Sequence, residues 1–143
     1  MVKPIPDGYP MVCPSLIVSG AEGLISFIGA VFGGTERMRM PMPDGTIAHA
    51  EVQVGDSVIM TADATEQWPA REAALHVYSE DVDAAYQRAL AAGATTEMEP
   101  ADQFYGERSA VVVDPWGNRW SIATHVEDVS DEEMMRRMAA MAG

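Results

Sequence analysis

The sequence predicts an α+β fold made of two repeated modules, each with the order strand, helix, strand, strand, strand. The stretch LHVYSEDVDAAYQRALAAG, at 75–93, is typical of a strand that leads into a helix ending at a glycine. Sliding the sequence along itself places Ile17-Val18-Ser19 over Val77-Tyr78-Ser79 and Gly33 over Gly93. Such self-similarity indicates a duplicated supersecondary unit. We expect one domain over residues 1–143, with module one at about 11–63, module two at about 73–126 and a C-terminal helix at about 130–142.

Composition restricts the possible partners and the compartment. A chain of 143 residues is long enough to bury the core of one domain. The net charge of −13 disfavours binding to nucleic acid or to an anionic membrane surface. A single cysteine, Cys13, excludes an intramolecular disulfide and Cys-rich metal motifs. The N-terminus has no apolar signal-peptide core, and no segment has the length of a membrane span, so we expect a cytoplasmic protein.

The elements of the first module follow from apolar patterns and turn residues. Residues 1–10 are rich in proline and should run over the surface without adding to the core. Leu24, Phe27 and Val31 recur at helical spacing, and glycines follow them. Proline, aspartate and glycine mark tight turns between the strands that follow. The expected elements are a strand at 11–18, a helix from about 21 to 32, and strands at 35–42, 46–54 and 57–62.

The second module repeats this order after a connection at 63–72. The turn DPWGN, at 114–118, has a structural explanation, because an Asp-Pro start and a glycine suit a tight turn between strands. The expected elements are a strand at 73–79, a helix at 81–92, strands at 94–99, 108–113 and 119–125, and an irregular turn at 102–107.

The segment SDEEMMRRMAAMAG, at 130–143, predicts a final helix. Ser130 and Glu133 have the spacing of a capping box. Met134, Met138 and Met141 form an apolar stripe at helical spacing. Either the body of the protein or a second subunit should cover this stripe.

Several phrases resemble one known superfamily. They are MPMPDGTIAHAEVQVGDSVIM, SEDVDAAYQRALAAGA, DQFYGERSAVVVDPWGNRW and ATHVEDVS. Together with the order of elements over residues 11–126, they resemble the glyoxalase, bleomycin-resistance and extradiol-dioxygenase superfamily, also called vicinal oxygen chelate proteins, and within it the PhnB-like branch. The resemblance implies two modules whose eight strands curl around a cavity, helices on the outer face, and a homodimer.

The resemblance also bears on metal binding. Metal-dependent members place His or Glu ligands at the start of the first strand of each module and on its last strand. In this sequence these positions fall at Cys13 or Pro14, at Met60, at Ala74 and at Ser121. A divalent metal enzyme needs about three nitrogen or oxygen ligands, which one thiol and one hydroxyl do not supply. We therefore expect no metal and no other cofactor.

Alternation along the strand at 46–54 places His49, Glu51 and Gln53 on one face and apolar side chains on the other. Two interpretations of the polar face stay open. If it meets solvent, these residues are a solvated strand surface. If it meets the cavity, Glu51 would favour a charged His49, and the pair would be catalytic, a base with an orienting carboxylate.

His76 and Tyr78 share a face of the first strand of the second module and are cavity candidates. A lone histidine on a strand is more often structural than functional, so both interpretations apply to His76. Tyr105 either forms the wall of an apolar ligand pocket or packs within its loop. We predict that His49, Glu51, His76 and Tyr78 line one shared pocket for a small, partly aromatic, neutral or cationic ligand. The full set of predicted ligand-binding residues is His49, Glu51, Met60, His76, Tyr78, Tyr105 and Ser121.

Three classes of function remain. The first is a metal-independent small-molecule binding protein that sequesters its ligand, as a resistance protein does. The second is a lyase, isomerase or dioxygenase-like enzyme that uses the His49 and Glu51 site, with or without a non-standard metal. The third is a module that binds a partner through its Met-rich helix. The sequence does not identify the ligand.

Overall fold

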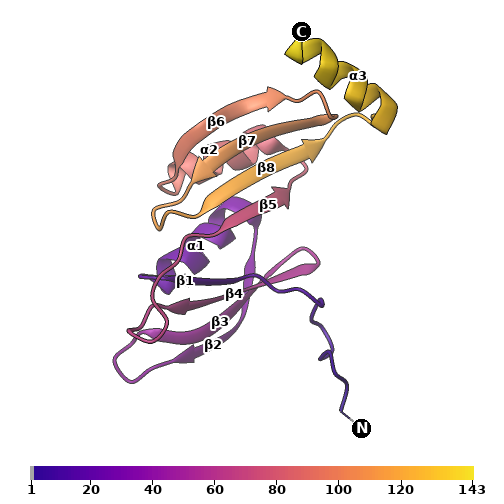
Figure 1. Cartoon of the computed structure of the whole chain (residues 1–143). Coiled ribbons are helices and arrows are strands. Elements are labelled where there is room, and N and C mark those ends of the chain that lie inside the picture. Colours follow the sequence, from indigo (N-terminus) through magenta and orange to yellow (C-terminus); the bar gives the residue numbers. More distant parts are fainter. Residues whose placement is uncertain (1) are drawn as a thin grey trace. The chain divides into compact units, whose positions relative to one another are not determined.

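The structure, a computed structural model, describes residues 2–143. The chain divides into two compact units, one up to Ala73 and one from Ala74 onwards, and each has the element order βαβββ (Figure 1). Unit one contains β1 (Ser15–Val18), α1 (Ala21–Phe32), β2 (Thr35–Pro41), β3 (Ile47–Val54) and β4 (Ser57–Asp63). Unit two contains β5 (Ala74–Tyr78), α2 (Val82–Ala91), β6 (Thr95–Asp102), β7 (Glu107–Val113), β8 (Arg119–His125) and the C-terminal α3 (Asp131–Ala142). The predicted α+β class with a C-terminal helix is confirmed.

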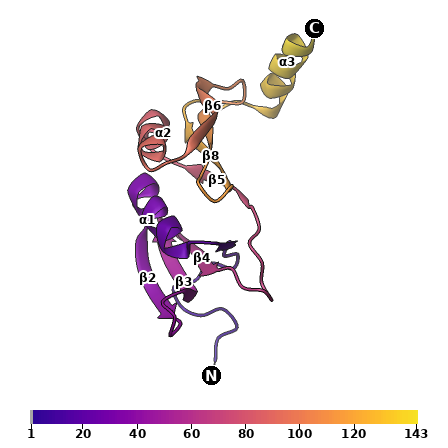
Figure 2. The same ribbon diagram turned by 90° about the vertical axis from the view of Figure 1, so that its left-hand side faces the viewer.

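Each unit is a four-stranded mixed sheet with one helix packed on one face (Figures 1 and 2). The strand orders are β1-β4-β3-β2 and β5-β8-β7-β6, and the first strand of each unit runs parallel to the last. The cores lie between helix and sheet, with Leu24 and Val52 fully buried in unit one and Trp120 and Ile122 in unit two. We call the sheet face opposite the helix the open face. The predicted enclosure of one cavity by all the strands stays a prediction.

The N-terminus of α1 is held by a residue from the far end of its unit. Gly20, the residue before the helix, has a left-handed backbone with φ 115°. Because glycine has no side chain, the N-cap residue cannot cap the helix itself. The carboxylate of Asp63, at the end of β4, accepts hydrogen bonds from the N–H groups of Gly20 and Ala21 at 2.9 Å each. Its second oxygen accepts from the N–H of Ile47. Asp63 therefore fixes the helix against the sheet and satisfies donors that a helix start leaves unpaired.

Several strand boundaries differ from the expectation, most of them by one residue. The largest difference is in the first strand, which covers only residues 15–18 of the predicted 11–18, because Pro14 lacks the N–H group that a ladder needs. The strand predicted at 94–99 extends to Asp102 as β6. Glu107 begins β7 instead of belonging to the irregular turn expected at 102–107, and the N–H of the preceding Gly106 donates to the carbonyl of Gln103 in a tight turn.

The prediction of a final helix is confirmed, but its methionine stripe is not packed in the core. The Ser130 side chain accepts a hydrogen bond from the N–H of Glu133, as the capping box requires. The carboxylate of Glu133 accepts hydrogen bonds from Arg136 and Arg137. It therefore does not make the second hydrogen bond of a capping box, to the N–H of Ser130. No residue of α3 is buried, and Met138 is 55% exposed. The body of the described chain therefore leaves Met138 and Met141 exposed, whereas Met134 is half-buried.

Candidate functional site

The open face of unit one carries a cluster of charged and polar side chains around Glu51. The carboxylate of Glu51, in the middle of β3, lies 2.8 Å from Nε2 of His49 and accepts a 2.6 Å hydrogen bond from the hydroxyl of Tyr9. The Glu51 residue is only 3% exposed. The structure thus brings the two predicted catalytic residues together, and the N-terminal segment, which was expected only to run over the surface, contributes Tyr9 to cover one of them.

A β-bulge brings Arg37 into this cluster. The register of β2 against β3 shifts between Glu36 and Met38, which leaves Arg37 as the extra residue. Its guanidinium lies 3.7 Å from the Glu51 carboxylate and over the Tyr9 ring, 4.5 Å from the ring centroid. It also donates to the backbone carbonyl of Gly8. Arg37 therefore ties the N-terminal segment to the open face of the sheet.

The electrostatics of the cluster favour an ionised Glu51. The hydrogen bond from Tyr9 lowers the pKa of the Glu51 carboxyl, and His49 and Arg37 lower it further, against the effect of burial. The same hydrogen bond raises the pKa of Tyr9. A fixed carboxylate that contacts a part-exposed imidazole can orient that imidazole for proton transfer. In the pairing of β3 with β4, Met60 lies directly opposite Glu51, so these two predicted ligand-binding residues are neighbours in the sheet.

A second polar group lies on the open face of unit two. Nδ1 of His76 is 3.1 Å from the Ser121 hydroxyl, and its ring meets that of Tyr78 edge to face at 4.9 Å. The hydroxyl of Tyr78 donates to Glu107 at 2.6 Å, and Nε2 of His76 lies 3.8 Å from the same carboxylate. The hydrogen bond to Glu107 raises the pKa of Tyr78. We call His76, Tyr78, Glu107 and Ser121 the β5–β8 group.

Glu107 is the member of this group that the sequence reasoning missed. It was assigned to a turn, yet extending the alternation of Val111 and Ser109 back by one more step would have placed it on the same face. The register of β5 against β8 places His76 opposite Ser121. Ala74, where metal-dependent members of the superfamily would have a metal ligand, lies opposite Arg119.

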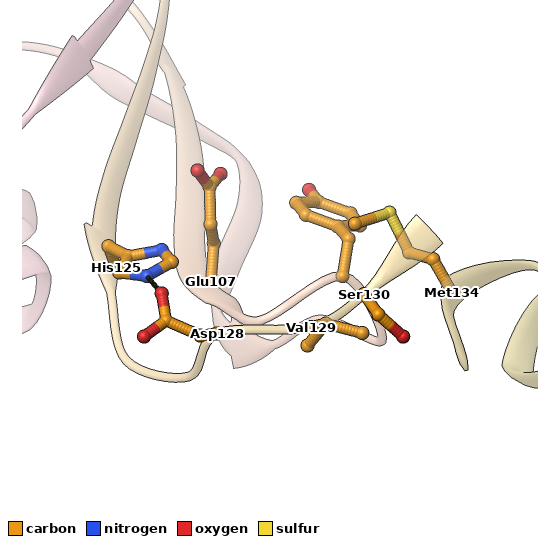
Figure 3. A pocket seen from close by; sticks show the side chains of 7 residues that line it. Glu107, His125, Asp128, Val129, Ser130 and Met134 are labelled. Carbon is orange, nitrogen blue, oxygen red and sulfur yellow. Dashed lines mark hydrogen bonds and ion pairs between the residues drawn. The ribbon is translucent and has the colours of Figure 1, made fainter. Parts of the chain in front are cut away.

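Tyr105 lies in a cleft of about 600 Å³ within unit two. In Figure 3, Glu107, His125 and Asp128 lie toward one side of this cleft and Met134 toward the other. Nε2 of His125 is 2.8 Å from the Asp128 carboxylate. The sequence predicts Tyr105 as a pocket wall but not the rest of the cleft, because the lining comes from a turn, a strand end and the linker before α3, which are brought together only by the fold. The lining residues are Tyr105, Glu107, His125, Asp128, Val129, Ser130 and Met134.

The predicted site residues therefore form two sets. His49, Glu51 and Met60 lie together in unit one, and His76, Tyr78 and Ser121 lie together in unit two. The shared pocket for both sets stays a prediction. Within residues 2–143, no three His, Cys, Asp or Glu side chains are grouped so that they could hold a metal ion. No helix in the described part of the chain is long and apolar enough to cross a membrane.

Comparison with known proteins places this geometry in a family. An uncharacterized protein of Mycobacterium bovis is 33% identical over 142 residues, which cover 92% of this chain and 93% of the relative. Among solved structures, TioX from a Micromonospora species has a TM-score of 0.70 and 25% identity, over 82% of this chain and 99% of the other. TnmS3, an antibiotic binding protein from a Streptomyces species, has a TM-score of 0.63 and 23% identity, over 79% and 93%.

The family model of the Glyoxalase/Bleomycin resistance protein/Dioxygenase superfamily matches residues 11–122, which cover all the elements of both βαβββ units except the last three residues of β8. This match agrees with the repeated modules and with the resemblance of the sequence phrases. The chain belongs to the Glyoxalase/Bleomycin resistance protein/Dioxygenase superfamily.

Proposed function

We propose that this protein is a metal-independent small-molecule binding protein of the bleomycin-resistance type, which sequesters its ligand without converting it. The observation that carries the proposal is the β5–β8 group. A hydroxyl, an imidazole and an aromatic ring are gathered on an open sheet face, where the Tyr78 residue is 64% exposed. Polar groups that converge beside aromatic surface are typical of small-molecule sites.

The chemistry of the family's metal positions supports a metal-independent role. Cys13 or Pro14, Met60, Ala74 and Ser121 offer one thiol, one thioether and one hydroxyl, which are a poor set for a divalent cation. The fold of TnmS3, an antibiotic binding protein, is compatible with the same role. We also propose, from the phrases given above, that the protein belongs to the PhnB-like branch. From the composition we propose that it is cytoplasmic, and from the repeated modules that it forms a single domain with a shared pocket.

Elemental analysis of the purified protein tests metal independence. We expect far less than one equivalent of Zn, Mn, Fe or Ni per chain. None of the positions where metal-dependent members have metal ligands carries an imidazole or a carboxylate in this chain. His76→Ala is the informative variant, since His76 lies opposite Ser121 in the sheet. About one equivalent of metal in the natural chain, lost in His76→Ala and kept in His125→Ala, would contradict the proposal.

Sequestration without conversion is tested by a thermal-shift screen of small molecules. Each compound that stabilises the protein is then tested for turnover. We expect hits that raise the melting temperature, are recovered unchanged, and lose their effect in Tyr78→Phe or Ser121→Ala. Arg119→Gln, on the same strand as Ser121 and paired with Glu97, is the matched control and should retain binding.

An enzyme is the second candidate, and the 2.8 Å contact between His49 and Glu51 favours it. In that case a hit from the screen is converted, and His49→Ala abolishes the conversion while binding continues. His49 is the better residue to change because Glu51 is buried and its removal would disturb the fold. Conversion that persists in His49→Ala would exclude this pair as the catalyst.

A further inference from the structure

The cleft in unit two is formed where the segment before α3 meets the start of β7 and the end of β8. Its volume of about 600 Å³ is that of a small-molecule pocket, for which 300–1,000 Å³ is usual. Tyr105 and Glu107 lie within residues 11–122, which match the superfamily, whereas the lining residues from His125 to Met134 lie beyond them. The cleft therefore forms where the C-terminal segment meets the matched region.

The polar side of the cleft has two carboxylates, Glu107 and Asp128, and its lining includes no Lys or Arg. Asp128 is exposed and pairs with His125, whereas the Glu107 side chain has, in the described part of the chain, only a hydrogen bond from Tyr78 and a 3.8 Å contact with His76. The side chain of Glu107 is only 12% exposed, and within residues 2–143 no arginine or lysine pairs with it. The nearby Arg108 is held by Asp83, and Arg137 by Glu127. A largely buried carboxylate that lacks a full cationic partner is costly and favours an incoming cation.

The other side of the cleft favours a flat apolar group. Tyr105, Val129 and Met134 supply an aromatic ring, a branched side chain and a thioether. An aromatic face attracts cations, and a methionine side chain adapts its shape to aromatic rings. Phe104 meets the Tyr105 ring edge to face at 5.2 Å, which limits the movement of that wall.

We propose that this cleft binds a small, flat aromatic cation, such as a protonated aminoheterocycle, with its N–H donors at Glu107 and its ring against Tyr105 and Met134. The inference deepens the proposed function and rests on it, because Glu107 also belongs to the β5–β8 group. It adds the class of ligand and the role of the C-terminal segment.

The test compares binding of 9-aminoacridine, which is cationic at neutral pH, with binding of neutral acridine, by calorimetry on the full chain. We expect one molecule of 9-aminoacridine per chain and affinity for acridine that is weaker by about tenfold or more. Glu107→Gln should remove that preference, whereas Glu99→Gln, an exposed acid on β6 outside the cleft, should keep it. Equal affinity for both compounds, or equal losses in the two variants, would overturn the proposal.

A second pair of variants tests the cleft without changing Glu107, in case Glu107→Gln does not fold. Met134→Lys places a cation in the cleft and should block 9-aminoacridine, whereas Met138→Lys, one turn later and outside the lining, should not. If 9-aminoacridine fails to bind but hits of the thermal-shift screen still do, the cation site is wrong and the proposed binding function stands. If no compound binds in either experiment, the proposed function fails as well.

Discussion

Glu51 is the residue whose environment is least like that of an ordinary surface strand. An ionised carboxylate removed from water loses several kcal/mol of solvation unless partners replace it. Tyr9, His49 and Arg37 are those partners, and two of them also hold the N-terminal segment against β3. The contacts that hold the N-terminal segment on unit one therefore also hold Glu51 beside His49, the candidate catalytic pair.

Tyr9→Phe tests this role. The change removes one hydrogen bond to the Glu51 carboxylate and should lower the free energy of unfolding near neutral pH. Because the folded-state pKa of Glu51 lies below its ordinary value of 4.5, its contribution is complete above pH 4.5 and is lost as the pH falls through the folded value. In Tyr9→Phe that pKa rises towards 4.5, so the acid-induced loss of stability is smaller and is complete at a higher pH than in the natural chain.

Urea denaturation at a series of pH values measures both effects. Tyr105→Phe, which removes a hydroxyl elsewhere in the chain, is the control and should leave the acid profile unchanged. An acid profile for Tyr9→Phe that superimposes on that of the natural chain would show that the Tyr9 hydrogen bond does not stabilise ionised Glu51.

Alternation was enough to predict that His49 and Glu51 share a face, because the side-chain period of a strand is fixed. It could not predict Tyr9 or Arg37. Tyr9 reaches Glu51 across 42 positions of the chain from a segment without secondary structure, and Arg37 reaches it through a bulge. A bulge inserts one residue and changes the alternation, and no residue in TERMRMP marks where it occurs.

At the scale of elements, Gly106 fixes the segment that forms the cleft. Its backbone φ is 91°, and its carbonyl accepts hydrogen bonds from the N–H groups of Val126 and Glu127. An added Cβ would lie 2.2 Å from the carbonyl oxygen of Glu127. The turn before β7 and the segment after β8 are thus in close backbone contact, and a larger residue cannot be accommodated without moving one of them.

Gly106→Ala should lower the free energy of unfolding by more than about 1 kcal/mol, because strain from the positive φ and a backbone clash add. Gly33→Ala is the matched control, since Gly33 also has a positive φ, 69°, but an added Cβ meets nothing within 4 Å. Thermal denaturation compares the two variants, and hydrogen exchange of residues 126–134 reports the displacement. Equal losses for both variants would show that the contact with Glu127 adds nothing.

The existence and order of the elements could be predicted from the sequence, because apolar periodicity and turn residues act locally. What could not be predicted is which surface an element covers. The stripe of Met134, Met138 and Met141 has the spacing of a packed helix, yet the structure leaves it exposed apart from the contact of Met134 with the cleft. Amphipathic spacing specifies a face but not its partner.

At the scale of the whole molecule, the exposed methionines of α3 favour the homodimer that the family resemblance implies. An apolar stripe rimmed by charged residues on a protein surface is typical of an interaction site. A twofold interface would bring the same stripe from two chains together. The acidic first turn and the two arginines that follow would meet their counterparts if the helices run antiparallel.

Sedimentation velocity over a range of protein concentrations tests the dimer. We expect the natural chain to sediment as a dimer at micromolar concentration, and the triple variant Met135→Gln, Met138→Gln, Met141→Gln to sediment as a monomer, because the apolar area that drives association is lost. The triple variant Met38→Gln, Met40→Gln, Met42→Gln removes three exposed methionines from unit one and is the matched control. A natural chain that stays monomeric, or a control that dissociates equally, would exclude α3 as the dimer contact.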